Sequence, residues 1–248
     1  MIEIIGGFLL IIIIFILLFW LKKTLFVFGF FFKIISLLFV ILIVGSILVS
    51  YYVITDANNF KNNFSNSTNL FLLKESVNGT NEIITGIAIH PGNVSLETIT
   101  RDQLDQMQKY YNSGNMDSLN TQYYKVFVID TEALGNISQI SINGKDVNLT
   151  GDEAREILLS STPRETLAGI VAKKSGTDAS LELSSLKATD DEVKGFIFSY
   201  YLTDIFNPQN IAHMLISLKN NGIQVYKQTA LFTAIKFIPE QIISLVAK

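Results

Sequence analysis

Few side chains in this chain have the types and spacing that chemistry needs. It contains two histidines, His90 and His213, and no cysteine, so it can form neither a disulfide nor a thiolate metal site. The two histidines could share a metal ion, but nothing in their spacing brings them together. A hydrogen-bonded His90 beside Pro91 and a helical His213 between apolar residues are the simpler interpretation.

The hydroxyl and acidic side chains form no complete catalytic pattern. Serines and threonines are plentiful, yet the sequence has no G-x-S-x-G and no glycine-rich phosphate loop. Three acids cluster in residues 189–195, TDDEVKG, where the spacing of Thr189 and Glu192 predicts a helix start. The helix macrodipole favours negative charge in a first turn, so this cluster requires neither a metal nor catalysis.

One stretch stands apart: residues 126–145, VFVIDTEALGNISQISINGK, where a strand ends in Asp-x-Glu before a glycine and a hairpin. It resembles the first motif of the DEDD-type 3′–5′ exonucleases. The resemblance implies that Asp130 and Glu132 hold divalent metals that activate water and steady the leaving oxygen. The family's two further acid motifs are not found, and Leu218 stands where an acid would follow His213. We therefore interpret Asp130 and Glu132 as loop carboxylates, and expect no enzyme activity, cofactor or metal.

Charge and hydropathy change together near Thr55. Of the 22 acidic and 19 basic residues in the 248-residue chain, 21 and 16 follow Thr55, so that part is acidic. An acidic domain does not favour nucleic-acid backbones as partners. Before Thr55 most residues are Ile, Leu, Phe or Val, which marks a separate segment.

This first segment holds two long uncharged stretches, residues 4–21 and 34–54. Each approaches the roughly 20 helical residues that cross a hydrocarbon core. Three lysines lie between them: Lys22, Lys23 and Lys33. A lysine in the middle of a span costs roughly 2.5 to 3.5 kcal/mol, whereas one at the interface costs little. The sequence therefore predicts a transmembrane helical hairpin over residues 1–55, with the lysines at its turn.

The same lysines predict the orientation of the hairpin. Basic residues in short loops stay in the cytoplasm, so both the N-terminus and everything after Thr55 are expected outside it, in an integral protein of the cell membrane. Trp20 near the inner surface, and Tyr51 and Tyr52 near the outer one, fit the aromatic belts. The alternative is a cleaved signal peptide, but the first stretch lacks a basic start and a small-residue cleavage site.

Six asparagines in the pattern N-x-[ST] follow the second stretch, on the side predicted to be external. They are possible glycosylation sites in a host that has the machinery: Asn63, Asn66, Asn78, Asn93, Asn136 and Asn148.

The remaining sequence predicts a stalk and a mixed helix and sheet domain. Residues 56–81 are rich in Asn and Ser and are typical of a linker, with LFLLKES as an early strand. Residues 82–248 are predicted to form an extracytoplasmic α+β domain, with strands at 82–89 and 123–130. The dipeptide Asn143-Gly144 between apolar residues predicts a hairpin.

Helices are indicated by caps and apolar stripes. Thr100, Thr150, Thr162 and Thr189 each precede a Gln or Glu by three residues, the spacing of a capping box. A further helix should follow Asn207-Pro208. The last stretch, from about residue 223, is ambiguous between a strand followed by helices and one long strand. Its apolar spacing favours helix interrupted at Pro239, and a helix lying against the membrane is left open.

These features favour a membrane-anchored binding or scaffold protein, an accessory subunit of a membrane or cell-envelope assembly. Its expected partners are the lipid bilayer and other membrane or envelope proteins, and a homo-oligomer is left open. The alternative is an extracytoplasmic ligand-binding or sensor module, and a remote one is a metal-dependent hydrolase or nuclease using Asp130 and Glu132. An exposed apolar patch would favour the first class, an enclosed pocket with convergent polar groups the second, and a third acid beside this pair the last.

Overall fold

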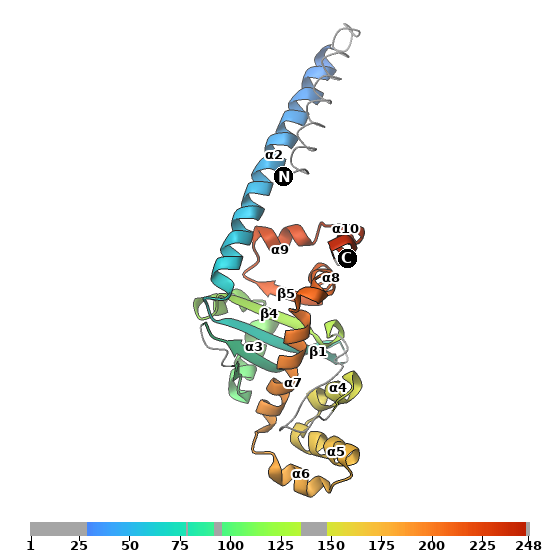
Figure 1. Cartoon of the computed structure of the whole chain (residues 1–248). Helices are drawn as coiled ribbons and strands as arrows, with labels where there is room; N and C mark the ends of the chain where they lie inside the picture. The colour runs from blue at the N-terminus through green and yellow to red at the C-terminus, as the bar shows by residue number, and fades with distance from the viewer. Residues whose placement is uncertain (1–28, 78, 92–95, 135–147, 247–248) are drawn as a thin grey trace. The chain divides into compact units, whose positions relative to one another are not determined.

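The computed structural model of the chain describes residues 29–77, 79–91, 96–134 and 148–246. It comprises two compact units, Met1–Tyr52 and Val53–Lys248. The described part of the first unit is helical, and the second unit is a domain of mixed helices and sheet (Figure 1). An α+β fold is therefore confirmed for the second unit.

Helix α2 (Gly29–Phe64) contains the second predicted span. Its part Leu37–Phe64 is long and apolar enough to cross a membrane, and it is the one such helix among the residues that the structure describes. Large apolar side chains such as Leu42 and Ile47 are exposed along it, as are Tyr51 and Tyr52. The first predicted span and the turn residues Trp20, Lys22 and Lys23 lie outside the described residues, so the structure does not show a two-helix hairpin.

The domain is built on a five-stranded sheet of order β3-β2-β1-β4-β5. Its strands are β1 (Asn69–Val77), β2 (Thr80–Ile89), β3 (Leu96–Thr98), β4 (Lys125–Asp130) and β5 (Ile223–Tyr226). The pair of β1 and β4 is parallel and the other pairs are antiparallel. The neighbouring strands β1 and β4 contain the unbroken apolar runs LFLL and VFVI because both faces of the sheet are covered there.

The helices after α2 pack on the sheet or on one another. They are α3 (Arg101–Asn112), α4 (Gly151–Leu159), α5 (Pro163–Ser175), α6 (Ala179–Ser185), α7 (Asp190–Ile205), α8 (Ile211–Lys219), α9 (Ala230–Ile235) and α10 (Glu240–Val246), with short 3-10 turns η2 (Met116–Thr121), η3 (Thr131–Ala133) and η4 (Pro208–Asn210).

Alternate residues of β1 and β4 point to opposite faces of the sheet. On one face Leu70 and Val126 pack against α3 and η2. On the other, Phe71 and Phe127 stack with ring centroids 4.9 Å apart and are covered by α7, α8 and α9 among others. Figure 1 shows α7 crossing this face.

Within residues 56–81 the early strand predicted at LFLLKES is confirmed, and the rest of the segment is a helix end and the start of a second strand where a linker was expected. Residues 56–64 continue α2, and 69–77 form β1 at the centre of the sheet. Phe60 and Phe64, at the end of α2, pack against the core, and the Phe64 ring lies 5.9 Å from that of Phe127. The polar composition misled because Asn and Ser occupy the exposed side of the last turns of α2 and the turn into β1, while the phenylalanines face the core.

Capping boxes form at three of the four predicted positions. The backbone amides of Thr100, Thr150 and Thr189 donate to the side chain three residues on, at 2.9, 2.7 and 2.6 Å. At Thr162 the helix starts as predicted with Pro163 at its first position, but the box is absent. There the Thr162 amide donates to Ser160 Oγ instead, at 3.0 Å.

The box acceptor Glu153 also forms an ion pair with Lys174 of α5 at 2.6 Å. Burial raises the pKa of Glu153, but the hydrogen bonds from Lys174 and Thr150 outweigh it, and the net shift is downward from 4.5.

The C-terminal stretch resolves into the strand β5 followed by α9 and α10, with Pro239 between the two helices. The predicted break at Pro239 is therefore confirmed. Of the two alternatives that the sequence left open, the structure has the strand followed by helices and not the one long strand. The predicted hairpin at Asn143-Gly144 lies outside the described residues.

Candidate functional site

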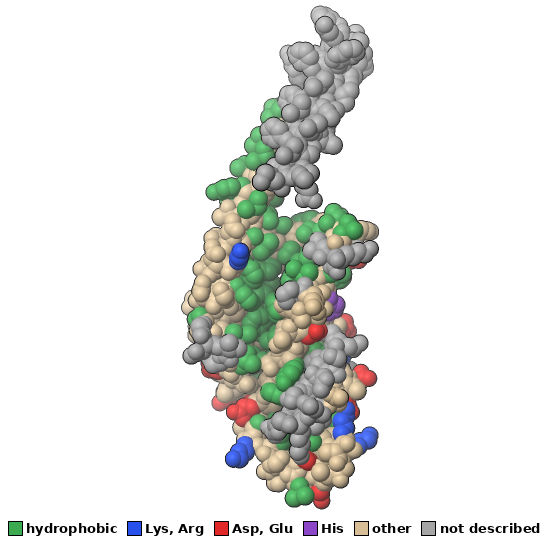
Figure 2. All heavy atoms as spheres, viewed as in Figure 1, with side chains coloured by type: hydrophobic (Ala, Val, Ile, Leu, Met, Phe, Trp, Pro, Cys, Tyr) green, Lys and Arg blue, Asp and Glu red, His purple; other side chains and the backbone are tan. Residues whose placement is uncertain are grey.

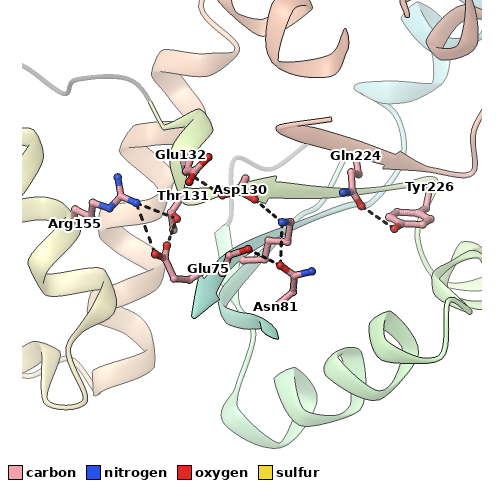
Figure 3. Close-up of polar contacts among 10 residues, drawn as sticks. Glu75, Asn81, Asp130, Thr131, Glu132, Arg155, Gln224 and Tyr226 are labelled. Carbon is pink, nitrogen blue, oxygen red and sulfur yellow. Dashed lines mark hydrogen bonds and ion pairs between the residues drawn. The ribbon is translucent and has the colours of Figure 1, made fainter. Parts of the chain in front are cut away.

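A cluster of polar and charged side chains lies where β1 and β4 end. These strands are parallel, and their register places Lys74 opposite Asp130. Because side chains alternate, this pair lies on one face of the sheet and the next residues, Glu75 and Thr131, on the other. Figure 3 shows both sets of contacts at this sheet end.

On the first face, Lys74 Nζ forms an ion pair with Asp130 Oδ2. The side chains are only 7% and 16% exposed, so both charges have lost most of their water. Asp130 Oδ1 accepts the backbone amide of Glu132 at 3.1 Å, which caps the turn η3. Lys74 Nζ also lies 3.5 Å from Asn81 Oδ1. Both carboxylate oxygens of Asp130 are thus engaged within the domain.

On the other face, the Thr131 hydroxyl donates to Glu75 Oε2. Arg155 of α4 completes the group, with Nη2 3.3 Å from Thr131 Oγ1 and 3.8 Å from Glu75 Oε1. These contacts tie the end of the sheet to α4. The cluster therefore closes the core and fixes a helix, and its charges are paired.

The Asp-x-Glu pair of the exonuclease resemblance falls in this cluster. Asp130 faces a buried ammonium where a bound cation would have to sit, and Glu132 is exposed on η3. Within the described ranges, no three His, Asp or Glu side chains gather closely enough to hold a metal ion. The geometry favours the interpretation of these acids as structural carboxylates.

The histidines lie on different elements. His90 directly follows β2. Its Nε2 atom lies 2.7 Å from Glu97 Oε2, and its Nδ1 atom lies 3.2 Å from Thr68 Oγ1. This confirms the predicted hydrogen-bonded His90. His213 is helical as predicted, in α8, but its side chain is exposed.

A hollow of about 460 Å³ opens between β3 and α7, and we call it the α7 hollow. Its lining is mainly apolar: Leu96, Leu167, Leu186, Ala188, Val193 and Phe196. Leu96 and Phe196 are themselves exposed. At its floor α7 touches β3 through Gly195, where an added Cβ would lie 2.5 Å from Thr98 Oγ1.

A second hollow of about 340 Å³ lies along β5, the strand at the opposite edge of the sheet from β3, and we call it the β5 hollow. Its lining is more polar and includes Asp117, Asn221, Gln224, Gln228 and Lys236. Lys236 Nζ donates to Asn221 Oδ1 at 3.1 Å. Tyr226 Oη donates to Gln224 Oε1 at 3.0 Å, as Figure 3 shows.

The end of α2 and the start of α9 form a junction within the domain. Asp56 Oδ2 accepts the backbone amide of Leu231 at 2.8 Å, and the Phe60 ring meets that of Phe232 edge-on at 5.3 Å. Lys125 Nζ lies 5.2 Å from the centre of the Phe232 ring and donates to the Lys227 carbonyl at 2.8 Å. Burial lowers the pKa of Lys125, an effect that Asp56 opposes.

The predicted surface sites are described only in part. Asn63, Asn66 and Asn148 are exposed. The side-chain amides of Asn63 and Asn66 donate to the backbone carbonyls of Asn59 and Asn62, four residues earlier in each case. The other asparagines of the pattern lie outside the described residues: Asn78, Asn93 and Asn136. Lys33 lies in α2.

Sequence reasoning missed the polar partners of Asp130. Lys74 and Glu75 were placed in the stalk, and Arg155 was one helical residue among others. The only local signal was the short segment LFLLKES, an apolar run ending in opposite charges, which is how a central strand leaves a core. Nothing in it indicates a partner 56 residues away.

The fold and these sites define a class: an α+β domain preceded by an apolar helix, with paired charges at its sheet end and two open hollows. Comparison with protein-family models, with curated proteins and with solved structures finds no match to the chain.

Proposed function

We propose that this protein is a membrane-anchored binding or scaffold protein whose domain acts outside the cytoplasm, as an accessory subunit of a membrane or cell-envelope assembly. The observation that carries this proposal is α2. Residues 34–54 contain no charge, and large apolar side chains such as Leu42 and Ile47 are exposed along the helix. In water such a surface is unfavourable by about 25 cal/mol for each Å², whereas a bilayer solvates it.

The connection to the domain supports a function at the membrane surface. The uncharged stretch ends at Ile54, and Phe60 and Phe64, only a few residues further on, already pack against the core of the domain. So short a connection along the chain keeps the domain near the membrane in which the stretch is proposed to lie. Such tethering raises its effective concentration for other proteins of the same membrane.

The α7 hollow supports binding as the activity. Its exposed apolar residues Leu96 and Phe196 lie on the domain and away from the core, and exposed apolar patches mark protein interaction sites. We propose that it receives an apolar side chain of a partner in the membrane or envelope, or of a second copy of the chain. The polar lining of the β5 hollow favours the second candidate, a ligand-binding or sensor module.

Anchoring and sidedness can be tested together in the full chain, which has no native cysteine. Single cysteines at Lys22 and at Asn66 would be labelled in intact cells with an impermeant thiol reagent, and the membranes would then be isolated and extracted with alkali. We expect the protein to resist extraction and to be labelled at 66 and not at 22. Extraction into the soluble fraction would refute the anchor, and labelling at 22 alone would place the domain in the cytoplasm.

Binding at the α7 hollow can be tested by photo-crosslinking in the native membrane. A benzophenone amino acid replaces Phe196 in one variant and the exposed Leu181 of α6 in a matched control. We expect discrete cross-linked products from position 196 alone, and products of twice the chain's mass would identify a second copy. Equal cross-linking from both positions would contradict a specific partner at this hollow.

A further inference from the structure

The last part of the domain, α9, α10 and the turn between them, carries both buried and exposed apolar side chains. Three of these side chains are buried in the domain: Phe232, Ile235 and Ile243. Three others are exposed: Phe237 in the turn, and Ile242 and Leu245 in α10. A helix that lies on a domain in water carries polar residues on its outer side. An apolar outer side therefore indicates a cover other than water.

The junction with α2 indicates what this cover is. The amide of Leu231, at the start of α9, is held by Asp56 of α2 at 2.8 Å. Asp56 is the first charged residue after the uncharged stretch 34–54. Because a charged residue next to a span lies at the membrane surface, α9 starts at the level where the apolar stretch meets water.

The rest of the surface lies at the same end of the domain. Figure 1 shows α9 and α10 together at the end where residues 53–64 join the domain, and hydrophobic side chains gather there in Figure 2. Lys219 of α8 donates to the Ile238 carbonyl at 2.7 Å, which fixes the chain between the two helices. Lys236 is held by Asn221, so Phe237 stands outside a well-anchored backbone.

We propose that α9 and α10 lie in the lipid–water interface of the leaflet at which α2 ends, with Phe237, Ile242 and Leu245 inserted among the lipids. This inference rests on the proposed membrane anchor and adds a second contact with the same bilayer. Interfacial helices bury an apolar face at the boundary between head groups and acyl chains. With two contacts, at Asp56 and along α9 and α10, the domain has a fixed orientation on the membrane surface. One membrane span alone would leave the domain free to rotate.

The test uses the full chain in phosphatidylcholine vesicles. Phe237→Cys and, separately, Ile242→Cys carry a bimane label, whose emission shifts to the blue in apolar surroundings. Leu181→Cys on α6 is the matched control, because Leu181 is 66% exposed and Phe237 81%. Lipids brominated close to the head group quench any label that reaches them. Flotation on a density gradient first establishes that the protein is in the vesicles.

We expect blue-shifted emission and several-fold stronger quenching at positions 237 and 242 than at 181. Protein that floats while the labels at 237 and 242 are quenched no more than that at 181 overturns this inference and leaves the anchor standing. Protein that does not float refutes the anchor itself. Blue-shifted emission that bromine does not quench, and that grows with the ratio of protein to lipid, identifies a second copy as the cover and also overturns the inference.

Discussion

The buried ion pair of Lys74 and Asp130 yields the sharpest prediction. Removing one partner of a buried pair leaves the other charge without compensation and costs about 3–5 kcal/mol. Asp130→Leu strands the less exposed group, the 7% exposed ammonium, and also removes the cap on the Glu132 amide. Lys74→Met strands a carboxylate that is 16% exposed and keeps the Glu132 amide. We therefore expect Asp130→Leu at the upper end of that range and Lys74→Met at the lower end.

The double variant separates the pair from the rest of the site. With both charges replaced by apolar groups of similar size, stability should return to within about 1 kcal/mol of the parent, because the cost of desolvating the charges disappears with their attraction. The matched control is the exposed pair of Arg101 and Asp105 on α3, 3.7 Å apart. The same cycle there should give a coupling below about 0.5 kcal/mol.

Urea unfolding of the full chain in detergent micelles, followed by circular dichroism, measures these values if the m values of the variants agree. Single variants within about 0.5 kcal/mol of the parent would refute a structural role for the pair. The nuclease alternative makes the opposite prediction for metal. If Asp130 were a ligand, Mn²⁺ would stabilise the parent and not Asp130→Leu, and Lys74→Met would strengthen the effect.

Three further predictions concern the helices and are measured in the same unfolding assay. Thr189→Ala removes the cap acceptor of α7 and should cost about 1 kcal/mol, whereas Thr162→Ala, where no side-chain cap forms, should change stability by less than about 0.5 kcal/mol. Because the pKa of Glu153 is lowered on folding from 4.5, its stabilisation is present above pH 4.5 and lost as the pH falls through the lowered pKa, and Glu153→Gln should flatten the acid limb of stability against pH. Gly195→Ala forces a Cβ against Thr98 and should lower the free energy of unfolding by roughly 1–3 kcal/mol. Gly169→Ala on α5, where the added Cβ has open space, should raise it by about 0.5–1 kcal/mol. The reverse order of stabilities would contradict the close contact of α7 with β3.

The parts of the fold that the sequence predicted depend on local signals. The caps at Thr100, Thr150 and Thr189 involve residues only three positions apart, so the helices that they start were found at the right place. The strand at 125–130 was found because a run buried on both faces is apolar throughout. These signals require no knowledge of the neighbours.

The parts that were missed depend on distant neighbours. The strand β1 was expected from LFLLKES, but its place at the centre of the sheet follows only from pairing with β2 and β4. The partner of Asp130 was missed for the same reason. β3 has three residues and is defined by its register with β2, so no sequence pattern of strand length exists to detect it.

The two apolar surfaces of the domain support different contacts because of where they lie. α9 and α10 are at the end that residues 53–64 join, while α5 and the start of α7, which border the α7 hollow, are at the opposite end (Figure 1). If the first surface rests on lipid, the second faces away from the bilayer and is free to meet another protein. If a second copy of the chain covered both surfaces, the cross-linker at position 196 and the label at position 237 would both report contact with protein. The cross-linking and the quenching experiments therefore test one arrangement from its two ends: lipid at 237 together with a specific partner at 196 is the outcome that a membrane-bound scaffold requires.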